Sequence, residues 1–226
     1  MNDDSGSIWE RSGPDDVDSG PYAVLVSMWM ALGIGVTAIA AYLTQSWVPD
    51  LVAIIALLVV SIIGIIIALV SDSSLISFIG FVLLVVPTGM LLGPFVALYT
   101  EASVFKIFFV TTGLAVVLGV VGALCPIDLA PIGSVLFGVL GMLLVGYFYA
   151  GIATLVGIPI DGALTWLDWI GVVLFSIYII YDWNRAMNIP HTVDNSVDSA
   201  MALYLDFINL FIRLLELFGE KKESDT

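Results

Sequence analysis

Seven long apolar stretches divide the chain, and they restrict its fold more than any other feature. They cover residues 22–44, 51–70, 75–99, 104–124, 131–156, 164–187 and 199–218. A helix needs about 20 mainly apolar residues to cross a hydrocarbon core of about 30 Å, and these stretches have that length. Only 12% of the 226 residues are charged, against about a quarter in soluble globular domains. The sequence therefore predicts an all-α integral membrane protein with seven transmembrane helices.

The last stretch, 199–218, differs from the others because it carries polar side chains along one stripe. At about 100° per residue, Asp206, Asn209, Arg213 and Glu216 fall on one face of a helix. A helix of this kind hides its polar stripe from lipid by packing it against other helices. We therefore expect the seventh helix to be central and wrapped by the other six.

The two ends of the chain are polar. The first 21 residues hold six acidic side chains and one arginine, Arg11, a composition typical of disordered segments. We expect three regions: an acidic disordered tail over 1–21, a seven-helix membrane domain over 22–219 and a charged tail over 220–226. The formal net charge of −14 comes mostly from acids in tails and loops.

Residue counts argue against several kinds of site. Cys125 is the single cysteine and His191 the single histidine, so neither a disulfide framework nor a cysteine–histidine metal cluster is expected. No basic patch is present, and nucleic acid is therefore not an expected partner. We expect no catalytic residue and no resident cofactor.

Prolines predict where helices bend or end. Pro87 and Pro94 lie inside the third stretch, where each removes a backbone donor and favours a kink or break. Two interpretations stay open: a bent helix packed on its neighbours, or a hinge that lines a cavity. Pro190 is expected to stop the sixth helix, with a polar loop over 191–198.

Two carboxylates lie within apolar stretches, Asp182 and Asp206. They are 24 residues apart, with Asp194 midway. If the sixth and seventh helices form an antiparallel hairpin that turns near Asp194, the two side chains reach about the same depth. Two carboxylates in a low-dielectric site share one proton and titrate as a unit. Such a pair would respond to pH and could bind Ca²⁺, although Ca²⁺ takes six to eight oxygen ligands.

A purely structural alternative pairs each acid with its own arginine. Arg185 follows Asp182 by about one turn and Arg213 follows Asp206 by about two, so two separate ion pairs could lock the bundle. Asn209 lies within one turn of Asp206 and could donate to it or supply an oxygen. Asp168 and Glu216 lie near the ends of their stretches, and the simplest expectation places them at the membrane interface.

Two short motifs resemble the Bax inhibitor-1 family, also called the transmembrane Bax inhibitor motif family. They are Tyr181-Asp182 and the nine residues Leu-Tyr-Leu-Asp-Phe-Ile-Asn-Leu-Phe over 203–211, with weaker likenesses at 92–94, 111–113 and 125–129. The resemblance implies a seventh helix surrounded by two layers made from the other six. It also implies the activity of bacterial members, pH-sensitive calcium leak channels whose paired-aspartate sensor corresponds to Asp182 and Asp206.

Other properties of the family differ between members. Eukaryotic members are associated with restraint of cell death and with calcium release from the endoplasmic reticulum, and some bacterial relatives act on a membrane-bound protease. In calcium-leak members an arginine on the second helix can latch the first aspartate, and a glutamate of that helix lies along the pore. Residues 51–70 carry no charge, so the latch is absent or is supplied by Arg185, Lys106 or Arg213.

The expected function is a pH-sensitive cation leak, with calcium as the transported ion, gated by protonation of Asp182 and Asp206. The alternative is a regulatory partner of another membrane protein, such as a protease, in which the buried acids are structural. Intramembrane aspartyl proteolysis also uses two aspartates, but no Gly-x-Gly-Asp arrangement surrounds either one. We expect a monomer that crosses a prokaryotic cell membrane several times, with the lipid bilayer and calcium as its partners.

Overall fold

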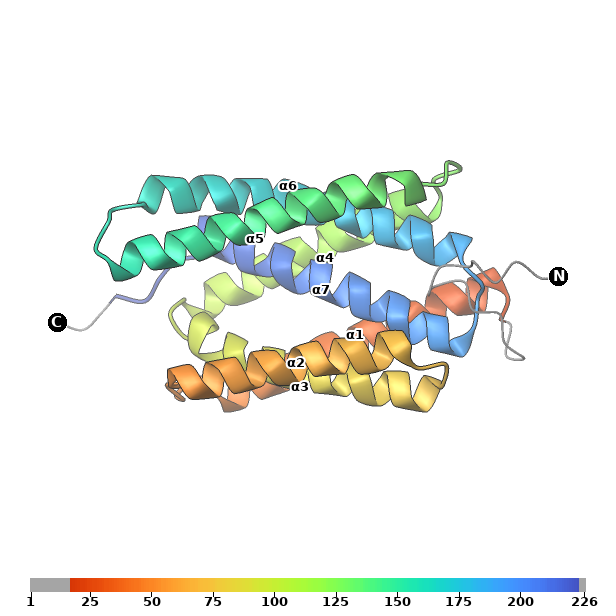
Figure 1. The fold of residues 1–226 in the computed structure, drawn as a ribbon, viewed down its shortest axis with the longest axis horizontal. Helices are drawn as coiled ribbons and strands as arrows, with labels where there is room; N and C mark the ends of the chain where they lie inside the picture. Colours follow the sequence, from red (N-terminus) through yellow and green to blue (C-terminus); the bar gives the residue numbers. More distant parts are fainter. Residues whose placement is uncertain (1–16, 224–226) are drawn as a thin grey trace. The chain divides into compact units, whose positions relative to one another are not determined.

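The computed structural model describes residues 17–223, and within that range the chain forms seven long α-helices and one short 3₁₀ helix (Figure 1). The helices are α1 (Ser19–Leu43), α2 (Leu51–Val70), α3 (Ser74–Val96), α4 (Glu101–Ala123), η1 (Ala130–Ile132), α5 (Gly133–Leu155), α6 (Asp161–Asn188) and α7 (Val193–Phe218). The predicted all-α class with seven helices is confirmed.

Six of these helices, α1 to α6, are long and apolar enough to cross a membrane. Helix α7 has 26 residues, which is about 39 Å of helix, but its composition is too polar for it to count among the candidate membrane spans. Its side chains are nevertheless enclosed, since only Glu216 and Phe218 of this helix are exposed. Enclosure by protein explains how so polar a helix is tolerated in a chain whose other long helices are apolar.

The chain forms two compact units. The first contains Met1–Tyr99, Ala186–Tyr204 and Lys222–Thr226, and the second contains Thr100–Arg185 and Leu205–Lys221. Helices α1, α2 and α3 therefore belong to the first unit, and α4, α5 and most of α6 belong to the second. Helix α7 contributes its N-terminal half to the first unit and its C-terminal half to the second.

Glycines allow the helices of the first unit to approach closely. A Cβ atom built on Gly64 of α2 would lie 2.5 Å from the carbonyl oxygen of Gly80 in α3, and one built on Gly80 would lie 2.5 Å from that of Gly64. A Cβ on Gly89 of α3 would lie 2.6 Å from the carbonyl oxygen of Thr37 in α1. Helix α3 thus lies at backbone contact with both α1 and α2 (Figure 1), a packing that only small residues allow.

Helix α3 continues through both of its prolines, which favours the packed interpretation over a break. Pro94 frees the carbonyl of Met90, and Thr44 Oγ1 of α1 lies 3.3 Å from that oxygen. Thr37 Oγ1 lies 3.1 Å from the carbonyl oxygen of Val85 in the same region. Hydroxyl groups of α1 therefore satisfy carbonyls of α3 near its prolines, which is how a proline is tolerated inside a membrane helix.

Helix α7 begins at Val193, earlier than predicted. The expectation of a loop over 191–198 is therefore wrong for residues 193–198, which are helical. Thr192 Oγ1 accepts the backbone N–H of Asn195 at 3.1 Å and caps the helix. Asp194 and Asp198 consequently lie within α7, where they are buried. The cap threonine, rather than the polar character of the segment, decides where the helix starts.

The terminal regions are described only in part. Helix α1 starts at Ser19, inside the predicted acidic tail, and residues 1–16 of that tail lie outside the described residues, as do 224–226. At the other end Glu220 is fixed to the start of α4: its N–H donates to Ser103 Oγ at 2.9 Å, and its carbonyl accepts from the Thr100 N–H at 2.8 Å.

Candidate functional site

Asp182 and Asp206 come together in the second unit. Asp182 lies in the last two turns of α6 and Asp206 lies at the middle of α7. Their carboxyl groups lie close enough to interact with each other, and the two residues are 8% and 5% exposed. Two carboxyl groups this close can share one proton, which one group donates and the other accepts.

One oxygen of the pair, Asp206 Oδ2, lacks a hydrogen-bond partner among the described residues. Asp206 Oδ2 is buried, and no other atom of the described residues hydrogen-bonds to it. Tyr178, one helical turn before Asp182, is electrostatically coupled to both acids. Sequence reasoning missed Tyr178, although its spacing of four residues from Asp182 places it on the same face of α6.

Arg185 is the nearest basic group to the pair in the described part of the chain. Its Nη1 lies 3.9 Å from Asp182 Oδ1, one turn further along the same helix. That distance is too long for a hydrogen bond, so Arg185 supplies positive charge to Asp182 without fixing its orientation. Of the three residues suggested as a substitute latch, Arg185 is the one that the structure places beside the pair.

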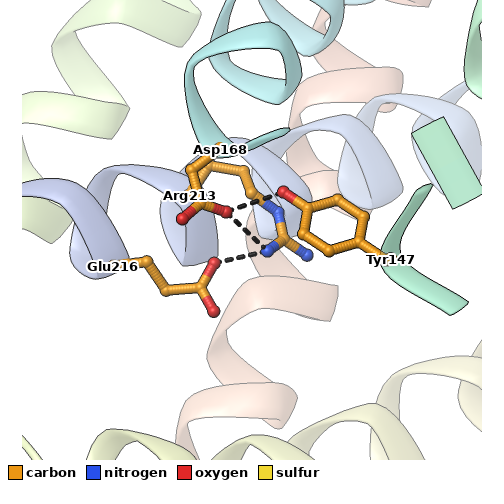
Figure 2. Close-up of polar contacts among 4 residues, drawn as sticks. All are labelled: Tyr147, Asp168, Arg213 and Glu216. Carbon is orange, nitrogen blue, oxygen red and sulfur yellow. Dashed lines mark hydrogen bonds and ion pairs between the residues drawn. The ribbon is translucent and has the colours of Figure 1, made fainter. Parts of the chain in front are cut away.

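Arg213 does not pair with Asp206, so this half of the structural alternative with two separate ion pairs is wrong. Its Nη1 donates to Asp168 Oδ1 of α6 at 3.1 Å and also to Glu216 Oε2 (Figure 2). Asp168 was expected at the membrane interface but is buried, at 7% exposure. It also accepts a hydrogen bond of 2.7 Å from the hydroxyl group of Tyr147 in α5. Sequence spacing along one helix could not reveal partners supplied by two others.

Asn209 does not support Asp206 in the way expected. Its Nδ2 donates at 2.8 Å to the carbonyl oxygen of Leu205 in its own helix. This local bond between a side chain and the preceding turn is common for short polar residues in helices. The aspartate pair therefore has Arg185 and Tyr178 as its near neighbours, rather than Asn209 and Arg213.

The aspartate pair offers few ligands for a resident metal ion. Within the described residues, no group of three or more His, Cys, Asp or Glu side chains could hold a metal ion. A Ca²⁺ ion at Asp182 and Asp206 would therefore take its remaining ligands from water or backbone carbonyls.

Comparisons with known proteins show what this chain is similar to. The family described as "Inhibitor of apoptosis-promoting Bax1" matches residues 24–223. The chain is 34% identical over 146 residues to "Inner membrane protein YbhL" of Escherichia coli K12, a match that covers 60% of this chain and 59% of that relative. It is 31% identical over 212 residues to an uncharacterized protein of Deinococcus radiodurans, with 84% of this chain and 86% of that relative covered.

A eukaryotic relative matches as well. The chain is 26% identical over 140 residues to "Bax inhibitor 1" of Schizosaccharomyces pombe, which covers 61% of this chain and 50% of the yeast protein. The family match extends from the first turns of α1 to beyond the end of α7, and so includes both residues of the aspartate pair. This chain therefore belongs to the Bax inhibitor-1 family, as the motifs over 181–182 and 203–211 predict.

Proposed function

We propose that this protein is a pH-sensitive cation leak channel in which Asp182 and Asp206 sense protons and calcium is the expected cation. The observation that carries the proposal is the burial of the two carboxyl groups beside each other, where each interacts with the other. In this proposal the protein conducts ions and catalyses no reaction, and no resident cofactor takes part. Six apolar helices support a multi-pass membrane protein, and the name of the Escherichia coli relative supports the inner membrane of a bacterium.

Loss of the shared proton changes the energy of the pair. Two negative charges about 4 Å apart repel each other by about 4 kcal/mol at an effective dielectric constant of about 20. The repulsion is relieved when the helices separate, when water enters or when a cation binds between the carboxylates. Each of these outcomes makes the site more permeable to a cation, so deprotonation favours conduction.

Arg185 reduces this repulsion without removing it. Its guanidinium lies near Asp182 but beyond hydrogen-bonding distance, and long-range attraction offsets part of the second negative charge. In a chain whose second helix has no charged residue, Arg185 takes the place of the latch found on that helix in calcium-leak relatives. The charge balance of the site is then set within α6 and α7.

The test is calcium flux into liposomes that contain the purified protein, measured across a series of pH values. We expect flux from the wild type to rise with pH, and we expect a flat pH profile from the double variant D182N/D206N. D72N, which removes an acid from the connection between α2 and α3, is the matched control and should keep the wild-type profile. Equal flux from the wild type and the double variant at every pH would contradict the sensor role.

The alternative, a regulatory partner of another membrane protein, predicts a different result in the same preparation. A second membrane protein would co-purify in stoichiometric amount, and the reconstituted chain alone would conduct no calcium. The buried acids would then be structural, and the double variant would lose stability without any change in flux.

A further inference from the structure

The side chain of Tyr178 lies one helical turn before Asp182, on the same face of α6. It is close enough to both acids of the aspartate pair to interact with them, more strongly with Asp206 of α7 than with Asp182. All three residues belong to the second unit. Helix α6 thus brings an O–H group to the pair in addition to one of the two carboxyl groups.

The hydroxyl group of Tyr178 and Asp206 Oδ2 complement each other as donor and acceptor. A tyrosine hydroxyl group can donate one hydrogen bond, and that of Tyr178 makes none with any residue in the described part of the chain. Asp206 Oδ2 is an acceptor that is buried without a partner among the same residues. A buried acceptor that lacks a donor is costly, and the cost is highest when the acceptor is charged.

Other groups of α6 near the pair are directed elsewhere. Arg185 Nη1 lies 3.9 Å from Asp182 Oδ1, and so its charge acts on Asp182. The hydroxyl group of Tyr181 faces Gly133 at the start of α5. Of the groups that α6 holds near the pair, Tyr178 is therefore the one that interacts mainly with Asp206.

Helix α4 and helix α7 itself add no donor for Asp206 within the described residues. Helix α4 contacts this part of α6 through Gly122 and through Gly119, whose Cβ position lies 2.6 Å from the indole Nε1 of Trp183. Asn209 of α7 uses its Nδ2 to donate to the carbonyl oxygen of Leu205. The donor for Asp206 Oδ2 must then come from Tyr178 or from water.

The packing of the Tyr178 ring keeps it beside the pair but does not enclose it. Its centroid lies 6.2 Å from that of the Phe175 ring and 6.3 Å from that of the Tyr181 ring. The side chain is half-buried, so it is less tightly packed than the two acids. A small rotation of the side chain can therefore move its hydroxyl group towards Asp206.

We propose that Tyr178 is a positioning residue of the proton sensor, whose hydroxyl group donates a hydrogen bond to Asp206 Oδ2 when the pair loses its shared proton. The inference rests on the shared proton of the proposed function, but not on conduction. Once that proton has left to water, both carboxylates are acceptors only. Because a hydrogen bond to a charged oxygen is stronger than one to a neutral oxygen, Tyr178 stabilises the deprotonated pair more than the protonated pair.

The experiment measures thermal unfolding of the purified full chain in detergent from about pH 4 to about pH 9, a range that includes the titration of ordinary and perturbed aspartates. The variant Y178F removes only the hydroxyl group. We expect it to unfold at the wild-type temperature at the acidic end and about 3–6 °C below the wild type at the alkaline end. The double variant Y178F/D206N should match D206N at every pH, because the charge that Tyr178 serves is then absent.

The matched control is Y181F, which makes the same change on the same helix at a hydroxyl group that faces Gly133. Any loss of stability in Y181F should be the same at all pH values. The inference is overturned if the difference between Y178F and the wild type does not grow with pH, or if it persists in the D206N background.

The wild-type profile separates this inference from the function on which it rests. A wild type whose unfolding temperature does not vary with pH lacks the shared proton, and both ideas then fail together. If the wild type does vary with pH but Y178F follows it exactly, only the role of Tyr178 is overturned. Flux is not measured in this experiment, so a protein that conducts no calcium would be recognised in the liposome pH series alone.

Discussion

Asp182 and Asp206 are buried close together although Asp182 lies near the end of α6 and Asp206 lies at the middle of α7. If the pair shares one proton, as the proposed function requires, the folded protein binds a proton that the unfolded chain releases to water at neutral pH. By linkage, the free energy of unfolding must fall as pH rises through the titration of the pair. The stability of this protein in detergent should therefore depend on pH even when no cation gradient is present.

The first prediction concerns D206N, which replaces the carboxyl group of Asp206 by an amide, whose N–H groups can donate at every pH. We expect the unfolding midpoint of the wild type to fall as pH rises above about 4, the usual range of an aspartate in the unfolded chain, by the equivalent of about 1–3 kcal/mol, and that of D206N to stay nearly constant. Differential scanning fluorimetry across a pH series measures both. D128N, at an exposed position, should follow the wild type, and a wild-type slope in D206N would contradict the shared proton.

The second prediction concerns Tyr204, whose hydroxyl group lies 2.6 Å from Thr37 Oγ1 in the first unit. Because Thr37 also lies within hydrogen-bonding distance of the Val85 carbonyl, the tyrosine helps to tie α7 to α1 and α3. We expect Y204F to reduce the free energy of unfolding by about 1–3 kcal/mol, the cost of a buried polar group left unpaired. Y42F, at an exposed tyrosine, should change stability little; equal stability of the two variants would count against the tie.

The third prediction uses the backbone contact between α2 and α3. G64A adds a Cβ atom 2.5 Å from the Gly80 carbonyl oxygen, and we expect it to cost more than about 3 kcal/mol because neither backbone can move aside freely. G35A is the control, since nothing lies within 4 Å of a Cβ atom there and alanine stabilises a helix relative to glycine. Thermal unfolding should separate the two variants in opposite directions.

The fourth prediction concerns Asn184, which holds the connection between α4 and η1. Its Oδ1 accepts from the Leu129 N–H at 2.8 Å, and its Nδ2 donates to the Ile127 carbonyl at 3.0 Å. We expect N184A to free this segment and raise the rate at which a maleimide labels Cys125 by roughly tenfold, as about 1.4 kcal/mol of lost restraint would. N209A, whose side chain bonds its own helix, should leave the rate unchanged.

The helices could be predicted from the sequence because the length of an apolar run is set by the bilayer. Residues 51–70 form a helix with the predicted limits, since aliphatic residues between two polar turns leave no other choice. The start of α7 could not be found in this way. It depends on the hydroxyl group of Thr192, one cap candidate among several polar residues.

The aspartate pair was found by spacing, but the geometric reason was only partly right. The hairpin was expected to turn at Asp194, which in fact lies within the first turn of α7. Equal depth in a symmetric hairpin therefore does not explain the contact. The sequence shows that two acids must be hidden from lipid, but the packing of α6 against α7 decides that the two acids meet.

The partners of Arg213 show the opposite case. Its own helix offers Asp206 and Glu216, and spacing alone gives no reason to prefer a carboxylate from α6. Asp168 becomes the partner because Gly171 lets the arginine side chain pass over α6 and Tyr147 covers the guanidinium. Long side chains select their partners through tertiary packing, which a linear spacing rule does not contain.

The contact between Gly64 and Gly80 also limits how the first unit can change shape. With two backbones touching and no side chain between them, there is no soft layer that could be compressed or sheared. Helices α2 and α3 must therefore move together as one rigid unit, and any change of shape in the first unit has to occur at contacts other than this one.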